Sequence, residues 1–336
     1  MITRYATMNS IRNQAGMTMV ELLVALAIGS FLMIGAVQVY NQSRQAFVIN
    51  ESIARVQETA QFAMDTVEAD LRMASNWGRN SRGSFVNGRY IDASDPDPLS
   101  LTTPSVNACG ADWALDLVQP LVGSNNAYTL PCAADNGAQA NSDVFTIRRA
   151  TVATAPLEAG LIQIQSTRIQ GELFANGIVP AGFNVDPALP PVSETHNLLV
   201  NSYYVSADSD LIPGVPTLRR KSLKGGAGGP NIEDEEVAPG VENIQIQLGV
   251  DVDEDNTVDR YVNPGDPIFI PGNAAYIPTS RVMTARIWMV VRGINHEIGI
   301  QDNVNYQPGD VNLGVYSDDY RRMQVSKTIL LRNARI

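Results

Sequence analysis

The first hydrophobic segment of the chain is long enough to cross a lipid bilayer. It begins near residue 17 and reads MTMVELLVALAIGSFLMIGAVQVYNQSR, and the 22 residues between Glu21 and Arg44 carry no charge. A helix needs about 20 apolar residues to cross the hydrocarbon layer. Arg4 and Arg12 precede the segment, which itself holds no basic residue before Arg44. This asymmetry predicts a cytoplasmic N-terminus, with the chain after about residue 42 beyond the membrane.

An amphipathic pattern continues the same helix past the apolar segment. Its apolar residues recur at steps of three or four: Ile53, Val56, Ala60, Ala63, Val67, Leu71 and Ala74. That spacing places them on one helical face. Gly78 offers a C-cap after the last of them. The pattern predicts one helix over residues 17–75, with its upper half in lipid and its lower half packed on a sheet.

The rest of the chain alternates between strand-like stretches and loops rich in Pro and Gly. Seven stretches are predicted strands: 143–149, 161–166, 197–207, 217–223, 241–251, 284–294 and 324–332. No amphipathic helix separates them, which favours antiparallel strands packed on the long helix and an α+β fold. Residues 79–141 are expected to be mostly loops, 224–230 a flexible hairpin connection, and the acidic run 232–236 a solvated loop.

Composition argues against several classes of function. The chain has 336 residues and a net charge of −11, from 24 Lys and Arg against 35 Asp and Glu. An acidic balance disfavours nucleic acid as a partner, because phosphate binding needs clustered Lys and Arg. The two imidazoles, His196 and His296, lie in neither a G-x-S-x-G nor an H-E-x-x-H context. We therefore do not expect an enzyme.

Two cysteines lie in the loop-rich region beyond the predicted membrane segment. Cys109 and Cys132 enclose 22 residues. In an oxidising compartment two cysteines at this spacing are expected to form a disulfide. The alternative is two unpaired thiols.

Glu21 is the one acidic residue at the start of the apolar segment. A carboxylate inside a bilayer costs a few kcal/mol and marks a candidate functional site. A secretory signal peptide has a shorter apolar core and a small-residue cleavage site after it. Here the small residue, Gly16, stands before the segment. If the chain is cut after Gly16, the new α-amine of Met17 lies one helical turn from Glu21.

The run GMTMVELLVALAIG resembles the N-terminus of type IV prepilins and pseudopilins. The resemblance implies that a prepilin peptidase cuts between Gly16 and Met17 and methylates the Met17 amine, although most members have Phe at that position. Met8 is an alternative start, which gives a shorter leader. Glu21 would pair with the Met17 amine of a neighbouring subunit during assembly, because a buried carboxylate is tolerated when it is paired with a charge.

The C-terminal part is similar to the large minor pilins of the PilW group. This similarity runs from Tyr203 and Tyr204 through VENIQ at residue 241 to the closing LLRN ending at Asn333. It implies a pilin-like long N-terminal helix packed on an antiparallel β-rich globular domain. The expected organisation is a cytoplasmic leader, a transmembrane and assembly half-helix, an amphipathic half-helix and a periplasmic domain, at residues 1–16, 17–42, 43–77 and 78–336.

The two resemblances together imply a minor pilin of type IV pilus assembly, in the complex that initiates the fibre or lies at its tip. Its partners would be other major and minor pilins, through the N-terminal helix, together with prepilin peptidase and the inner membrane. After assembly the subunit would lie in the pilus at the cell surface. The alternatives are a minor pseudopilin of type II secretion and a membrane-anchored periplasmic enzyme or binding module.

One acidic loop is a candidate calcium site. Asp251, Asp253 and Asp255 fill positions 1, 3 and 5 of an EF-hand-like pattern, followed by the Thr257 carbonyl and Asp259. Oxygen ligands on a short, tightly turning loop are what calcium prefers. The pattern lacks the final bidentate Glu, so the alternative is an exposed acidic hairpin without an ion.

Overall fold

The chain is described here from a computed structural model. The structure describes residues 16–89, 106, 109, 113–183, 192–226, 228–297, 300 and 302–334. The predicted leader, apart from Gly16, lies outside these residues. By its internal contacts the chain divides into two units, residues 1–51 and 52–336.

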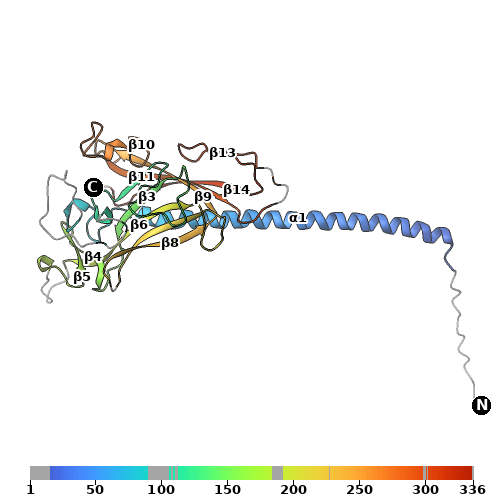
Figure 1. The fold of residues 1–336 in the computed structure, drawn as a ribbon, viewed down its shortest axis with the longest axis horizontal. Helices are drawn as coiled ribbons and strands as arrows, with labels where there is room; N and C mark the ends of the chain where they lie inside the picture. Colours follow the sequence, from blue (N-terminus) through green and yellow to red (C-terminus); the bar gives the residue numbers. More distant parts are fainter. Residues whose placement is uncertain are drawn as a thin grey trace, which may run out of the picture. The chain divides into compact units, whose positions relative to one another are not determined.

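The first unit contains the beginning of the long helix. Helix α1 spans Met19–Arg72 without interruption (Figure 1). Every residue from 16 to 51 is exposed. By length and composition α1 is able to cross a membrane. The single helix predicted over residues 17–75 is therefore confirmed, apart from a few residues at each end.

The end of α1 differs from the prediction. Backbone N–H groups of Met73 and Ala74 donate to carbonyls three residues earlier, and Ser75 takes a left-handed conformation with φ of 65°. These turns end the helix before Gly78, so the C-cap expected at Gly78 is wrong. Gly78 also has a positive φ, 81°, and a Cβ there would lie 2.4 Å from the Ser166 hydroxyl oxygen. It is needed for close packing rather than for ending the helix.

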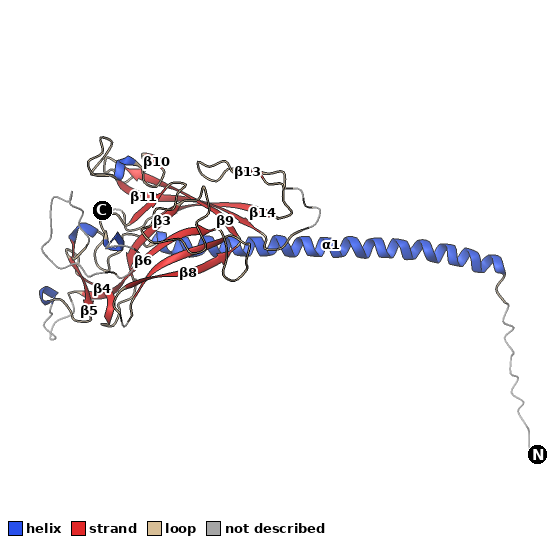
Figure 2. Ribbon diagram, in the orientation of Figure 1, coloured by secondary structure: helices blue, strands red, loops and turns tan. Residues whose placement is uncertain are grey.

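After the last turns of α1, the regular structure of the second unit consists of strands and short 3-10 turns joined by loops (Figure 2). The strands are β1 (Val86–Asn87), β2 (Leu121–Ser124), β3 (Val144–Ala150), β4 (Ala159–Ser166), β5 (Gly171–Asn176), β6 (Glu194–Ser206), β7 (Thr217–Lys224), β8 (Asn231–Pro239), β9 (Val241–Asp251), β10 (Arg260–Val262), β11 (Arg281–Arg292), β12 (Asn305–Tyr306), β13 (Gly314–Val315) and β14 (Arg322–Leu330). Short 3-10 turns are η1 (Gly83–Phe85), η2 (Trp113–Leu115), η3 (Ala181–Phe183) and η4 (Pro267–Phe269). All seven predicted strands are present, with ends shifted by a few residues.

These strands form two main sheets and a small hairpin. The larger sheet has eight strands in the path β1-β5-β4-β6-β3-β2, with β7 joined to β6 and β8 joined to β7. The second has the order β10-β9-β11-β14, and β12 pairs with β13. Pairing is antiparallel except for the short parallel ladder between β1 and β5. The α+β fold with antiparallel sheet is confirmed.

The apolar stripe of α1 forms the centre of the main core. Val56, Ala60, Ala63, Val67 and Leu71 are all buried, at 2% exposure or less. They belong to one cluster with side chains from both large sheets, such as those of β6, β9 and β11. Several positions in the stripe are Ala, which allows the helix backbone to approach the strands closely. The lower half of the helix therefore packs on sheet as predicted.

The acidic run 232–236 is a strand, so the prediction of a solvated loop is wrong. It lies in β8, opposite the basic strand β7, with Arg219 facing Glu236, Arg220 facing Glu235 and Lys221 facing Asp234. The Arg220 and Glu235 side chains are 2.7 Å apart. Opposite charges on facing strands stabilise a sheet and offset the repulsion within the acidic run. The connection between β7 and β8 is a hairpin, as predicted.

Candidate functional sites

The start of α1 is closed by a reciprocal pair of hydrogen bonds. The Thr18 N–H and hydroxyl donate to Glu21 Oε2 at 2.9 and 3.0 Å, and the Glu21 N–H approaches Thr18 Oγ1 at 3.3 Å. This arrangement is a capping box, which satisfies N–H groups at a helix N-terminus. Among the described residues the hydrogen-bond partner of Glu21 is Thr18, which carries no charge. Its carboxylate is thus positioned but not neutralised.

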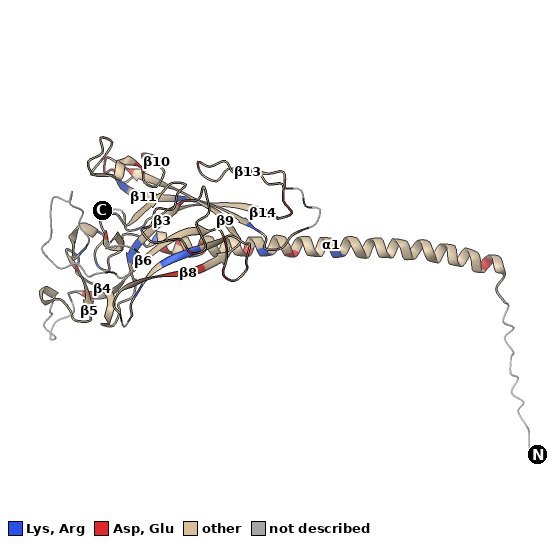
Figure 3. Cartoon of the chain, viewed as in Figure 1, with Lys and Arg blue, Asp and Glu red and all other residues tan. Residues whose placement is uncertain are grey.

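The helix that follows Glu21 presents apolar side chains on every side. Figure 3 shows this part of α1 nearly free of charge. The exposed large side chains include Leu22, Leu23, Val24, Leu26, Ile28, Phe31, Leu32, Met33, Ile34, Val37, Val39, Tyr40 and Phe47. A helix that is apolar all round is stable only in lipid or among other helices. We call residues 17–49 the assembly helix.

Asp70 joins the lower end of α1 to the larger sheet. Its Oδ1 accepts from Arg149 Nη2 at 2.7 Å and from Arg149 Nε at 3.0 Å. Its Oδ2 accepts from the Asn201 amide at 2.7 Å and from the Tyr203 hydroxyl at 2.6 Å. Asp70 is only 4% exposed, so these are buried, charge-assisted contacts. This cluster, the Asp70 latch, fixes the helix against β3 and β6.

A second link joins α1 to β14. Lys327 on β14 contacts Glu68, which also pairs with Arg72 one turn along the helix. The hydrogen bond from Lys327 is the main reason that the pKa of Glu68 lies below its ordinary value. The Glu68–Arg72 pair has the i,i+4 spacing at which opposite charges on a helix lie close together.

Sequence reasoning did not find the Asp70 latch. Asp70 stands three residues after Val67 and directly before Leu71, so an acid falls at the edge of the buried stripe. That position was the available signal, because a buried carboxylate needs a cation and hydrogen-bond donors. Its partners come from strands 79 to 133 residues away, which the local pattern does not reveal.

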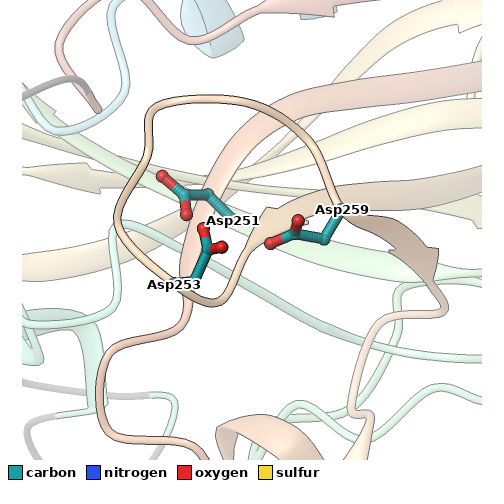
Figure 4. Close-up of side chains that lie close together, drawn as sticks. All are labelled: Asp251, Asp253 and Asp259. Carbon is teal, nitrogen blue, oxygen red and sulfur yellow. The ribbon is translucent and has the colours of Figure 1, made fainter.

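The acidic loop between β9 and β10 brings three of its four Asp residues together. Asp251, Asp253 and Asp259 each offer a carboxylate oxygen within 4.8 Å of the others (Figure 4). Asp251 is fully buried, and its oxygens accept from the backbone N–H groups of Glu254 at 2.7 Å and Asn256 at 2.9 Å. Asn256 has φ of 66°, a left-handed conformation that Asn tolerates.

A fourth predicted carboxylate ligand, that of Asp255, makes other contacts. The Asp255 carboxylate accepts from the Thr257 N–H at 2.7 Å and from the Thr257 hydroxyl at 2.6 Å. These hydrogen bonds lower the pKa of Asp255. Asp255 therefore bonds within the loop and lies outside the three-carboxylate cluster, and the five-ligand calcium site stays a prediction.

The predicted disulfide is present, and each of the two histidines lies within hydrogen-bond distance of a neighbouring oxygen atom. Cys109 and Cys132 are bonded to each other. His196 is buried in β6, with Nδ1 2.8 Å from the Thr151 carbonyl oxygen. The Nε2 atom of His296 lies 2.8 Å from the Tyr320 hydroxyl.

Two family models match the chain. Residues 11–37 match the prokaryotic N-terminal methylation motif, and residues 202–333 match the type IV pilus-assembly protein W. The searches of curated proteins and of solved structures find no match. The motif and the apolar helix fit a membrane-anchored protein, and the two matched models describe assembly components rather than enzymes.

Proposed function

We propose that this chain joins the complex that initiates the fibre. Its N-terminal methylation motif and its PilW-type domain support a minor pilin of type IV pilus assembly. The observation that carries the proposal is the assembly helix, which is exposed and carries no charge between Glu21 and Arg44. Such a helix is stable in the inner membrane before assembly and among other pilin helices afterwards. The partners are accordingly other major and minor pilins, and prepilin peptidase.

The size of the second unit favours a position at the tip of the fibre over a position in its shaft. The second unit comprises residues 52–336, all of them outside the assembly helix. A shaft repeats one packing many times, so a large domain must fit against every neighbour, whereas a tip position has free space beyond it. The N-terminus would lie in the cytoplasm and the second unit in the periplasm until the fibre reaches the cell surface.

Labelling of isolated fibres tests the tip position. An epitope inserted at the exposed connection near residue 228 and detected by gold-labelled antibody is expected at one end of each labelled fibre. A tagged major pilin in the same preparation serves as the control and should label along the length. Regular labelling of the shaft by this subunit would contradict the proposal. Absence from pili with presence in a secretion complex would favour the pseudopilin alternative.

Processing distinguishes a pilin from a periplasmic enzyme or binding module on a permanent anchor. We expect the intact mass of membrane-extracted protein to correspond to residues 17–336 with one added methyl group. Replacement of Gly16 with valine is expected to leave the leader attached, because a branched side chain then stands at the cut. A full-length mass for the unchanged protein would favour the permanently anchored alternative.

Calcium binding at the acidic loop stays a prediction, narrowed to Asp251, Asp253 and Asp259. Extracellular calcium sites often have dissociation constants near 10⁻⁴ M. At such an affinity, about 10 mM calcium would stabilise the folded chain by about 2.7 kcal/mol, which raises the unfolding temperature by several degrees. Differential scanning fluorimetry of the full chain in detergent, with and without calcium, measures this shift.

Two variants of the same loop sharpen the calcium test. Asp253→Asn removes one of the three converging carboxylates and should abolish the shift. Asp255→Asn removes an equal charge that bonds to Thr257 instead, and it should retain the shift. If calcium leaves the unfolding temperature of the unchanged protein unaltered, the loop is an acidic hairpin without an ion.

A further inference from the structure

The second unit contains a cleft beyond the C-terminal end of α1. Its volume is about 710 Å³. The walls are formed by residues 81–85 around η1, by residues 118–121, by the acidic loop at Glu254 and Asn256, and by the start of β11. Segments far apart in the sequence therefore enclose one space, which is the usual form of a ligand site.

Two arginines give the cleft a positive lining in a chain with a net charge of −11. Arg281 has one long contact, 3.4 Å from Nη2 to Asp251 Oδ2. Its Nε and Nη1 atoms have no hydrogen-bond partner in the described part of the chain. Buried donors in native proteins are nearly always satisfied, so this guanidinium has unused capacity for an acceptor.

The second arginine, Arg82, is exposed at the same cleft. Its guanidinium lies over the Phe85 ring, 5.5 Å from the centroid, and no salt bridge of Arg82 is found among the described residues. Among the described residues the carboxylate that lines the cleft is that of Glu254, and Asp251 pairs with Arg281 at its wall. Arg82 has no ion pair in the described part of the chain, and Arg281 keeps two unused donors, so the two guanidinium groups favour an anionic ligand.

The apolar lining restricts the kind of anion. Phe85 is 45% exposed and Val118 is 49% exposed, and both line the cleft together with Phe269. Inorganic phosphate would leave this apolar surface uncovered. A sugar usually binds on a free aromatic face, but Arg82 already covers a face of Phe85. A peptide with a carboxylate beside an apolar side chain matches both parts of the lining.

The walls that carry these groups are held in place. A Cβ at Gly83 would lie 1.8 Å from the Leu117 carbonyl oxygen, so η1 packs directly on the opposing backbone. Buried Arg148 donates to the carbonyls of Gln119 at 2.6 Å and Trp113 at 2.7 Å, which fixes the neighbouring wall. A preformed cleft loses less conformational freedom on binding than a mobile one.

We propose that this cleft binds an extended peptide segment that carries a carboxylate next to an apolar side chain. Arg281 and Arg82 hold the carboxylate, and Phe85 and Val118 contact the apolar side chain. A segment of another protein in the same assembly is the natural source of such a peptide. Binding of the peptide itself does not depend on the proposed pilus role, so the two proposals fail separately.

The test uses the full chain in detergent and two matched probes. The probes are N-acetyl-glutamyl-leucine amide and N-acetyl-glutaminyl-leucine amide, followed by saturation-transfer difference NMR, which detects weak ligands. We expect the glutamyl probe to bind at least about tenfold more tightly than its neutral isostere, the size of one charge-assisted hydrogen bond. Arg82→Gln and Arg281→Gln should each remove most of that preference.

Arg168→Gln is the matched control. Arg168 is exposed and does not line the cleft, so its replacement should leave the preference unchanged. Equal binding of both probes, no binding of either, or equal loss in the Arg168 variant would overturn the proposal. Glucuronate binding that depends on Arg82, in the absence of peptide binding, would assign the cleft to acidic sugars and would likewise overturn it.

Discussion

Replacement of Asp70 with alanine is expected to lower the free energy of unfolding of the second unit by about 3–5 kcal/mol, because it removes one partner of a buried ion pair. Arg149 would lose both of its hydrogen bonds to the carboxylate, and Asn201 and Tyr203 would each lose one. Asp70 is almost fully buried, so water does not readily replace it. Chemical denaturation of the full chain in detergent, followed by tryptophan fluorescence, measures the loss.

Asp65→Ala is the matched control on the same helix. The Asp65 side chain is 56% exposed and lies 3.8 Å from Lys327, so its loss should change the free energy of unfolding by no more than about 0.5 kcal/mol. Asp70→Asn keeps the shape of the side chain but not its charge. Its loss of free energy of unfolding should lie between those of Asp70→Ala and Asp65→Ala. If Asp70→Ala and Asp65→Ala have equal effects, the latch does not hold the helix to the sheet.

The parts of the fold that sequence reasoning predicted correctly have a local signal. The stripe from Val56 to Leu71 and the strand-like run at residues 241–251 can each be read within a window shorter than 20 residues. The α+β class followed from their order along the chain. β8 was missed because its charges indicate solvent, and only the facing strand β7 explains them. β5 was also missed: it is short, and although it pairs with β4 directly before it in the chain, its other neighbour, β1, comes from a distant region.

The candidate sites, like the fold, could be predicted only where the signal is local in the sequence. Spacing placed four Asp residues in one loop, but the loop conformation determines which of them converge, and Asp255 bonds to Thr257 instead. The Asp70 latch and the cleft around Arg281 both depend on contacts between distant segments. Glu21, in contrast, could be proposed as a candidate from the sequence alone, because a lone acid at the start of an uncharged segment is anomalous without any knowledge of the fold.

Replacement of Glu21 with glutamine is expected to reduce incorporation of this subunit into fibres by at least about a hundredfold. In the described chain its carboxylate is hydrogen-bonded by Thr18 but lacks a cation. After cleavage, the Met17 amine of a neighbouring subunit is the available cation, and an unpaired buried charge costs about 3–5 kcal/mol. Quantitative immunoblotting of sheared fibres, normalised to the membrane pool, measures incorporation.

Glutamine is the informative replacement because it can still accept from the Thr18 N–H, so the capped start of α1 is kept and only the charge is lost. Thr18→Ala is the complementary control, since it removes the capping hydroxyl and keeps the Glu21 charge. We expect that variant to be processed and incorporated at nearly the normal level. Incorporation of the Glu21→Gln variant at the normal level would show that the carboxylate does not pair with an amine during assembly, and that apolar packing of the helix alone is sufficient.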